Sequence, residues 1–329
     1  MNNQYTEDVI RKRPGIYVGS TDVRGVYYLI LGLIKLIIDS RKTQNIFMII
    51  LIDEQDTFHL ECDFPLNIKD HFEIEIIKAL SCSFDICIEQ DFFKIKFTPD
   101  REIFSYDTIE YYTLLGRLKE LAQLNDNIKF LFKDCKNKNV IQFHNGLEAM
   151  LMEGIYEFYF PESHNPIYIN FTKNDIEISA SMIYTGVSDI TLSYVNYSKT
   201  PDGGTHVNGL IDGLHYAFQK YIQTFGIKCS SSIRRTMYID NIDKNIKIAK
   251  EDVTKGLNFV ISIRMTQPTF AGATKRELVT KEIYSTVKNG VIEHIESILN
   301  SDKSFFDSSR VIHKAGIRIL RGKEAITHC

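Results

Sequence analysis

The chain alternates between short apolar runs with the two-residue period of β-strands and longer runs with the spacing of amphipathic helices. The alternation weakens at residues 156–166, where Pro161, His164, Asn165 and Pro166 form a turn-rich segment. With 329 residues, the chain is long enough for two domains of mixed helices and strands. Strands are predicted at residues 45–53, 57–62, 85–89, 92–97, 128–132, 140–143, 167–171, 175–184, 189–195 and 257–265, and the pair 128–132 and 140–143 flanks a lysine-rich turn. Helices are predicted at residues 23–39, 74–80, 106–124, 146–152, 205–225, 275–299 and, as a basic tail, 304–323.

The composition excludes several classes of protein. Hydrophobic residues make up 44% and charged residues 25%, which rules out a disordered or coiled-coil chain. With 39 Lys and Arg against 42 Asp and Glu, any nucleic-acid site must be a local basic patch. The amino-terminal residues lack the apolar core of a signal peptide, and the longest apolar run, residues 26–38, is too short to span a bilayer. Six scattered cysteines fit reduced thiols, so we expect a cytoplasmic protein without a membrane partner.

Three motifs carry more information than the rest of the chain. They are VIRKRPGIYVG at residues 9–19, TPDGGTH at residues 200–206, and EDVTKGLNFVISIRMTQPTFAGATKREL at residues 251–278. Taken alone, Asp202-Gly203-Gly204 predicts a turn, Thr205 a helix cap and His206 a structural histidine. No metal-ligand spacing and no nucleophile with a matching base emerge from the remaining residues, so no metal site is expected.

In this order, the three motifs resemble the ATPase half of the DNA gyrase B protein and of its topoisomerase IV relative. The resemblance covers nearly the whole chain. It implies an α/β (α+β) fold, with a degenerate GHKL (Bergerat-type) α/β sandwich at residues 1–155. It also implies a ribosomal-S5-domain-2-like transducer domain at residues 156–329, ending in a basic helix. For the family, it further implies ATP binding, ATP-driven dimer closure and changes in DNA topology.

The first departures from the family lie in the predicted helix 23–39. The family carries there a glutamate that activates the attacking water and, one turn later, an asparagine that holds Mg²⁺. Alignment from Gly25 places Gly32 at the glutamate position and Leu36 at the asparagine position, while Asp39 keeps its type. Since glycine takes no proton and leucine binds no metal, we expect no catalytic residue.

Several other residues with which the family contacts nucleotide are also missing from this sequence. Asp63 matches the family's adenine-reading aspartate with a one-residue slip, but the glycines that follow it in the family are absent, as is the glycine-rich phosphate lid. The family's Gln-Thr-Lys loop is Ala-Thr-Lys here, so Lys275 survives at the start of the predicted helix 275–299. Asp39, Asp63 and Lys275 are therefore interpreted as vestigial nucleotide-binding residues. Neither ATP nor Mg²⁺ is an expected cofactor.

Two basic clusters are candidates for DNA binding. The first cluster is Arg11, Lys12 and Arg13, and the second is Arg310, Lys314, Arg318, Arg321 and Lys323. The first cluster either contacts DNA phosphates or anchors the start of a helix. The second cluster either faces DNA or is a frayed basic tail.

The favoured hypothesis is a non-catalytic, gyrase-B-like pseudo-ATPase that acts by binding. Its partner would be DNA, a gyrase or topoisomerase IV subunit, or a gyrase-targeting toxin. The alternative is an ATPase fragment of a type II topoisomerase, gyrase-B-like, with a remodelled site for ATP and Mg²⁺. Only eight residues precede Val9, so dimerisation through an amino-terminal arm is not expected. No DNA-cleavage domain follows the transducer, so a complete topoisomerase subunit is not expected either.

Overall fold

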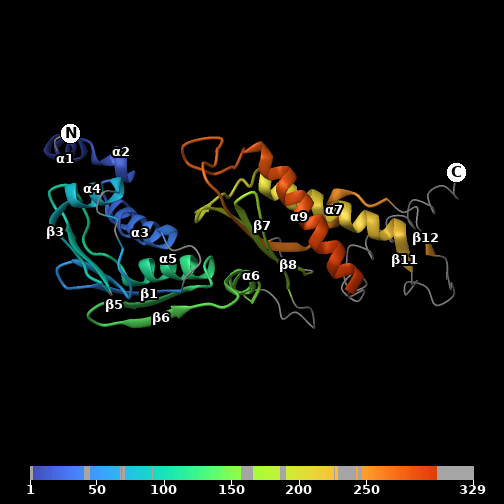
Figure 1. Ribbon diagram of the computed structural model, residues 1–329, viewed down its shortest axis with the longest axis horizontal. Helices are drawn as coiled ribbons and strands as arrows, with labels where there is room; N and C mark the ends of the chain where they lie inside the picture. Colours follow the sequence, from blue (N-terminus) through green and yellow to red (C-terminus); the bar gives the residue numbers. More distant parts are fainter. Residues whose placement is uncertain are drawn as a thin grey trace. The chain divides into compact units, whose positions relative to one another are not determined.

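The computed structural model describes residues 3–40, 45–66, 68, 71–90, 92–156, 166–185, 190–225, 227–228, 242–243 and 247–301. The chain divides into two compact units, Met1–Gly146 and Leu147–Cys329 (Figure 1). The predicted boundary after residue 155 falls at the end of helix α6 (Gly146–Tyr156) and stays a prediction. The predicted basic tail at 304–323 lies outside the described residues.

The first unit is built on a six-stranded mixed sheet with the strand order β3-β4-β2-β1-β5-β6. Strands β1 and β5 are parallel, and every other neighbouring pair is antiparallel. Burial alternates strictly along β1, so one face of the sheet is covered and the other is partly open. The bounds are β1 (Ile46–Ile52), β2 (Phe58–Cys62), β3 (Ser81–Ile88), β4 (Phe93–Pro99), β5 (Ile128–Lys133) and β6 (Lys138–Gln142).

Helices cover one face of this sheet (Figure 1). They are α1 (Asn3–Lys12), α2 (Pro14–Val18), α3 (Val23–Ser40), α4 (Phe72–Ala79) and α5 (Tyr111–Gln123). Helix α3 buries a continuous stripe that includes Val26, Ile30, Leu33 and Ile37, all of them fully buried. That stripe has the i, i+3, i+4 spacing that predicted the helix, and its opposite face carries Gly32 and Leu36.

The second unit contains a five-stranded sheet with the order β10-β9-β13-β8-β7, in which only β13 and β9 are parallel among the described strands. Its bounds are β7 (Ile167–Lys173), β8 (Ile176–Tyr184), β9 (Thr191–Val195), β10 (Ser198–Lys199) and β13 (Leu257–Arg264). Strands β11 (Ile227–Lys228) and β12 (Ile242–Asp243) form a separate pair. Strand β13 is buried almost throughout, including its polar residues Asn258 and Ser262.

Two long helices, α7 (Thr205–Phe225) and α9 (Lys281–Ser301), pack against each other and against this sheet (Figure 1). Glycine makes the close approach possible, because a Cβ on Gly213 would stand 2.8 Å from the Cβ of Val291. A short helix, α8 (Lys250–Thr254), precedes β13. The structure confirms the predicted fold class, a mixed α/β architecture with two mixed sheets. None of the described helices combines the length and apolar character needed to cross a bilayer.

Two predicted helix starts were wrong for identifiable reasons. Helix α9 begins at Lys281 rather than at residue 275, because the preceding backbone is engaged elsewhere: Val279 N–H donates to Thr269 O. Helix α5 begins at Tyr111 rather than at residue 106, because the Arg101 side chain donates to the carbonyls of Tyr106 and Asp107. Helices α1 and α2 were not predicted.

Candidate functional site

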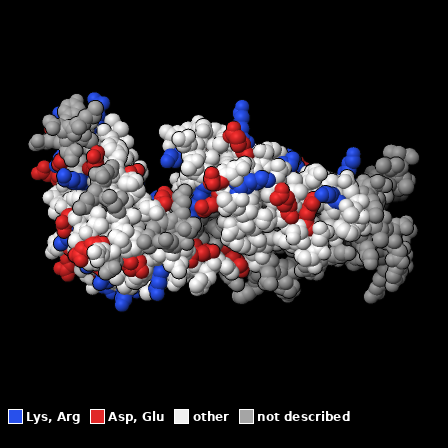
Figure 2. Space-filling view, viewed as in Figure 1, with Lys and Arg blue, Asp and Glu red and all other residues white. Residues whose placement is uncertain are grey.

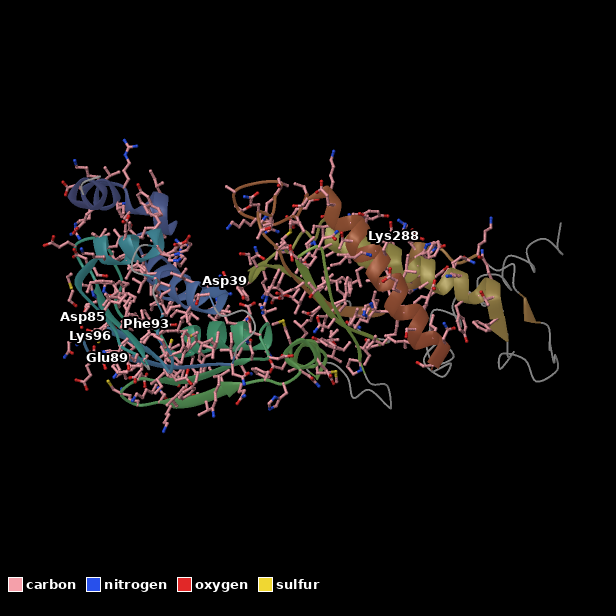
Figure 3. The ribbon with its side chains drawn as sticks, viewed as in Figure 1. Asp39, Asp85, Glu89, Phe93, Lys96 and Lys288 are labelled. Atoms are coloured by element: carbon pink, nitrogen blue, oxygen red, sulfur yellow. The ribbon has the colours of Figure 1, made fainter. Side chains whose placement is uncertain are left out.

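The positions that would carry nucleotide chemistry lie on the open side of α3. Gly32 and Leu36 are half-buried there, and Asp39 is exposed near the carboxyl end of the helix (Figure 3). A Cβ on Gly32 would meet no described atom within 4 Å beyond its chain neighbours and its helix backbone. Packing therefore leaves room for a larger side chain, but neither Gly32 nor Leu36 offers an oxygen atom. The side chains present at these two positions do not fit a Mg²⁺-bound nucleotide.

Asp63 follows directly on strand β2 and is exposed. The next residues are anchored in the core, because Phe64 and Leu66 are buried. A segment held by two buried apolar side chains lacks the conformational freedom that a glycine-rich loop would give this position.

Lys275 lies in an exposed loop rather than at a helix start, which corrects the sequence-based placement. Its backbone adopts a left-handed conformation with φ of 54°, and its N–H donates to Gly272 O at 3.1 Å. The ammonium group stands 6.0 Å from the centroid of the Phe270 ring. Asp39 and Asp63 belong to the first unit and Lys275 to the second, so each is placed only within its own unit.

The loop that carries Lys275 is fastened to the Pro-Asp-Gly-Gly turn. Arg276 donates two hydrogen bonds to the carboxylate of Asp202, at 2.7 and 2.8 Å. The fully buried Leu278 donates its N–H to Gly203 O and accepts from the N–H of Thr205. Only glycine fits at position 204, where φ is 125° and a Cβ would stand 2.1 Å from Leu278 O. The second and third sequence motifs therefore form one structural corner.

This corner has the predicted turn but not the predicted helix cap. The predicted turn at Asp202-Gly203-Gly204 is present, with positive φ at both glycines. Thr205 is not a cap, because α7 begins at Thr205 itself and its hydroxyl lies 3.4 Å from Leu278 O. His206 is fully buried, and its Nε2 lies 3.2 Å from the Thr200 hydroxyl, which in turn meets the Ser193 hydroxyl at 2.7 Å.

The amino-terminal basic cluster is divided between two roles. Arg11 lies in the last turn of α1 and donates to Ala79 O and to the Asp100 carboxylate, at 2.8 and 2.5 Å. Burial opposes ionisation of Asp100, but its hydrogen bonds with Arg11 and Glu102 N–H outweigh burial and lower its pKa. Arg11 thus anchors α1 to the sheet domain, which agrees with the alternative that this cluster anchors a helix. Lys12 and Arg13 are exposed, and their role in DNA binding stays a prediction.

The other DNA-binding candidates lie outside the described residues. They are Arg310, Lys314, Arg318 and Arg321, together with Lys323.

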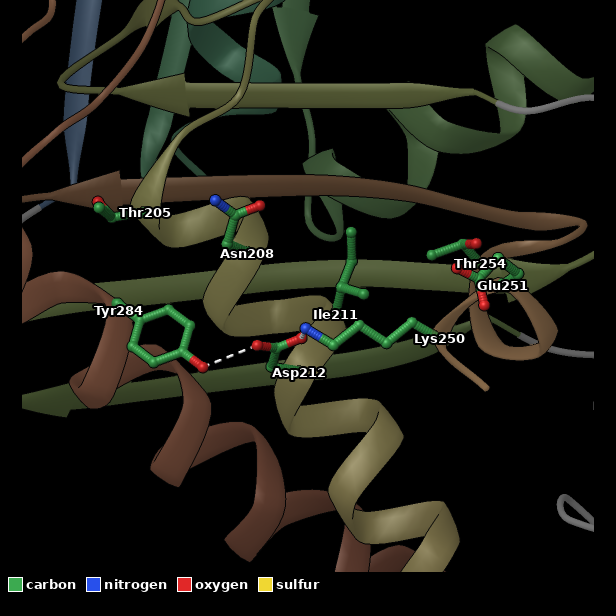
Figure 4. A pocket seen from close by; sticks show the side chains of 8 residues that line it. All are labelled: Thr205, Asn208, Ile211, Asp212, Lys250, Glu251, Thr254 and Tyr284. Atoms are coloured by element: carbon green, nitrogen blue, oxygen red, sulfur yellow. Dashed lines mark hydrogen bonds and ion pairs between the residues drawn. The ribbon is translucent and has the colours of Figure 1, made fainter. Parts of the chain in front are cut away.

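A cavity of about 580 Å³ opens on the second unit, and sequence reasoning missed it (Figure 4). Asp212 of α7 lies at its centre, 2.5 Å from the Lys250 ammonium and 2.7 Å from the Tyr284 hydroxyl. Burial is the largest single effect on Asp212 and opposes its ionisation, but the hydrogen bonds with Lys250 and Tyr284 and the positive charges nearby together outweigh burial and lower the pKa of Asp212. Asp212 and Lys250 form an ion pair, and Glu251 also lines the cavity, so the lining has one more carboxylate than ammonium group. Its other lining residues are Thr205, Asn208, Ile211, Glu251 and Thr254.

Within the described residues, no group of three or more His, Cys, Asp or Glu side chains is arranged to hold a metal ion. Each unit thus has its own candidate region. In the second unit it is the corner where the two motif loops are hydrogen-bonded to each other. In the first unit it is the face of α3 on which Gly32 and Leu36 offer no catalytic oxygen.

Comparison with known proteins agrees with this architecture. The family model for DNA gyrase B matches residues 124–318, which is more than half of the chain. The DNA gyrase B protein of Staphylococcus epidermidis is 26% identical over 97% of this chain, and that of Staphylococcus aureus is 25% identical over the same share. The chain spans 57% and 58% of the length of these two relatives.

Two solved structures share the fold. The 43K ATPase domain of Thermus thermophilus gyrase B, solved with an aminocoumarin, superposes with a TM-score of 0.78 at 19% identity, covering 98% of this chain and 96% of that one. The topoisomerase IV ATP-binding domain of Francisella tularensis, solved with a small-molecule inhibitor, gives a TM-score of 0.72 at 24% identity, covering 94% and 95%.

These similarities define the class of the protein: it has the architecture of the amino-terminal region of gyrase B and of its topoisomerase IV counterpart, a mixed α/β fold of the GHKL type with two mixed sheets. The chain belongs to the DNA gyrase B family.

Proposed function

We propose that this protein is a non-catalytic, gyrase-B-like module that acts by binding rather than by hydrolysing ATP. The observation that carries the proposal is the open face of α3, where Gly32 and Leu36 occupy the positions of the family's general base and metal ligand. Phosphoryl transfer depends on a positioned water and on a metal that neutralises charge, and these residues supply neither.

Retention of the scaffold supports the same proposal. The strand orders, the buried stripe of α3 and the tied motif corner of the second unit are those of packed, stable domains. Gly32, Leu36 and the segment after Asp63 lack groups with which the family would contact nucleotide. A fold that is kept without its nucleotide-binding residues can still serve to bind DNA or another protein.

The partners we propose follow from the family. Relatives named as DNA gyrase B proteins suggest DNA, or a gyrase or topoisomerase IV subunit, as the binding partner. Binding to such a subunit would modulate or protect it. Either partner would place the protein in the cytoplasm, where bacterial DNA lies.

Calorimetry tests the absence of nucleotide binding. A non-hydrolysable ATP analogue with Mg²⁺ is titrated into this chain and, as a positive control, into the ATPase domain of Thermus thermophilus gyrase B. We expect heat of binding only for the control. A dissociation constant on the order of micromolar for this chain, corresponding to about −8 kcal/mol, contradicts the proposal.

The alternative, a remodelled ATPase, makes an opposite prediction about the surviving polar residues. Asp39, Asp63 and Lys275 would then be required for turnover. ATP hydrolysis by the wild-type chain that is abolished by Lys275→Ala favours this alternative.

A further inference from the structure

The β5–β6 hairpin of the first unit presents four lysines. Lys133 pairs directly across from Lys138, and Lys129 pairs with Gln142, so Lys129, Lys133 and Lys138 share the open face of the sheet. Lys136 lies in the turn between the strands. All except the half-buried Lys133 are exposed or partly exposed, and Figure 2 shows blue side chains along the edge of the first unit that β5 and β6 form.

The charge of this hairpin is not balanced within it. Among the described residues, no carboxylate forms an ion pair with any of the four ammonium groups. Asp134 is the hairpin's one acidic residue. Its carboxylate accepts hydrogen bonds from the N–H groups of Lys136 and Asn137 and also attracts the Lys136 ammonium, so it offsets part of the charge of one of the four lysines. Two lysines directly opposite each other repel, which destabilises the hairpin unless an anion is bound nearby.

The other half of the same open face behaves differently. On β4, the Lys94 ammonium lies 3.2 Å from the Glu61 carboxylate, and Lys96 pairs across from Asp85 (Figure 3). Both β4 lysines therefore have an acidic neighbour on the same face. Among the described strands of this face, the lysines without an acidic residue opposite them are those of β5 and β6.

The inner side of the hairpin is fixed to helix α5. The Tyr111 ring stacks on Phe132 with centroids 4.4 Å apart and planes 7° apart, and its hydroxyl donates to Asn139 Oδ1 at 2.8 Å. The outer lysines therefore project from a rigid platform. Lys129 and Lys133 are four residues apart on one strand, about 13 Å, a distance that spans several phosphates of a nucleic-acid backbone.

We propose that the face formed by Lys129, Lys133 and Lys138, with Lys136, binds the phosphate backbone of duplex DNA. The proposal rests on the DNA-binding part of the proposed function and is independent of the absence of ATP hydrolysis. Lysine ammonium groups are hydrated point charges that suit phosphates without reading bases.

The chemistry of the face distinguishes duplex DNA from other polyanions. Single-stranded DNA needs exposed rings for stacking, but the neighbouring Phe47 is half-buried, with the Lys129 ammonium 5.7 Å from its ring centroid. The core of a protein–protein interface is depleted of charged residues and rich in aromatic ones, whereas this face carries lysines and, on the described β5 and β6, only Val140 as an exposed apolar residue, at 61%.

Fluorescence anisotropy with a labelled duplex of roughly 20 base pairs, at several salt concentrations, tests the proposal. We expect Lys129→Ala/Lys133→Ala/Lys138→Ala to weaken binding at least about tenfold at low salt and to reduce the slope of log K against log salt by about 2–3. The matched control is Lys94→Ala/Lys96→Ala, which removes two lysines from the charge-balanced half of the same face and should change both quantities little. Thermal unfolding verifies that both variants remain folded.

Three other results of this experiment would contradict the proposal. Wild-type binding with an unchanged slope in the triple variant overturns this site while leaving DNA binding by the chain intact. No binding by the wild type at low salt overturns both this site and the DNA-binding part of the proposed function. Tighter binding of single-stranded DNA, or equally effective competition by poly-glutamate, overturns the assignment to duplex DNA.

Discussion

The buried histidine of the second unit makes a quantitative prediction about acid stability. His206 is fully buried, its Nδ1 has no hydrogen-bond partner among the described residues, and its Nε2 meets the Thr200 hydroxyl. Burial removes the hydration of the imidazolium and lowers the pKa of His206 from 6.5 to about 4. The unfolded chain therefore binds a proton at a higher pH than the folded chain does.

The magnitude follows from this difference in pKa. The stabilisation is fully present above pH 6.5, and it is lost as the pH falls toward 4, because the unfolded state gains a proton first. Each pH unit within that window costs about 1.4 kcal/mol, so the free energy of unfolding of the second unit falls by about 2.5 kcal/mol by roughly pH 4.5. His206→Gln, which cannot titrate, lacks this loss.

The assay is urea unfolding monitored by hydrogen exchange in peptides of α7. Peptides of α7 report on the second unit alone, which is needed because the two compact units need not unfold together. We expect the difference in unfolding free energy between wild type and His206→Gln to change by about 2.5 kcal/mol between roughly pH 7.5 and pH 4.5. Thr200→Val is the matched control: it disrupts the same buried contact without removing the imidazole, so its pH dependence should follow that of the wild type. Parallel curves for wild type and His206→Gln refute the reasoning.

Three further substitutions test the packing of the two units. Gly32→Ala should stabilise the first unit by about 0.5–1 kcal/mol in urea unfolding, because α3 has room for the methyl group and alanine is the better helix former; destabilisation would show that the face is covered. Gly213→Ala should destabilise the second unit by about 1–3 kcal/mol in the same assay, because its Cβ would collide with Val291; an unchanged midpoint contradicts the close approach of α7 and α9. Arg11→Ala should cost about 1–3 kcal/mol, since it leaves the buried Asp100 carboxylate without its positively charged partner; a loss of DNA affinity at unchanged stability would instead identify Arg11 as a phosphate contact.

Elements with a strong apolar period were predictable from sequence. The helix predicted at 205–225 has those bounds in the structure, and the strand predicted at 257–265 ends one residue earlier, at Arg264. Helix α1 was missed because its sequence is mostly polar: Ile10 is its one buried residue among those whose side chains are described, and Arg11 anchors the helix through Asp100. No local pattern reports an ion pair made with a residue 89 positions away.

The site was predictable only where residue type decides the chemistry. Gly32 and Leu36 can be recognised as incapable of catalysis without a structure, since neither carries a polar side chain. The cavity around Asp212 could not be predicted, because Tyr284 lies 72 residues from it in sequence and Lys250 lies on a short helix without a periodic signal. The loop at Lys275 was mistaken for helix because the backbone that follows it is set by Gly203, outside any local window.

The corner where Arg276 meets Asp202 also has a consequence for how the chain acquires its structure. The two residues are 74 positions apart, so a long stretch of polypeptide must be brought together before their hydrogen bonds can form. Closing a loop of this length costs conformational entropy, and contacts of large sequence separation slow folding. Until residues 276–278 have been synthesised, the Gly203–Gly204 turn lacks the backbone partners that hold it. A nascent chain arrested before that point would carry α7 with an unsecured amino terminus.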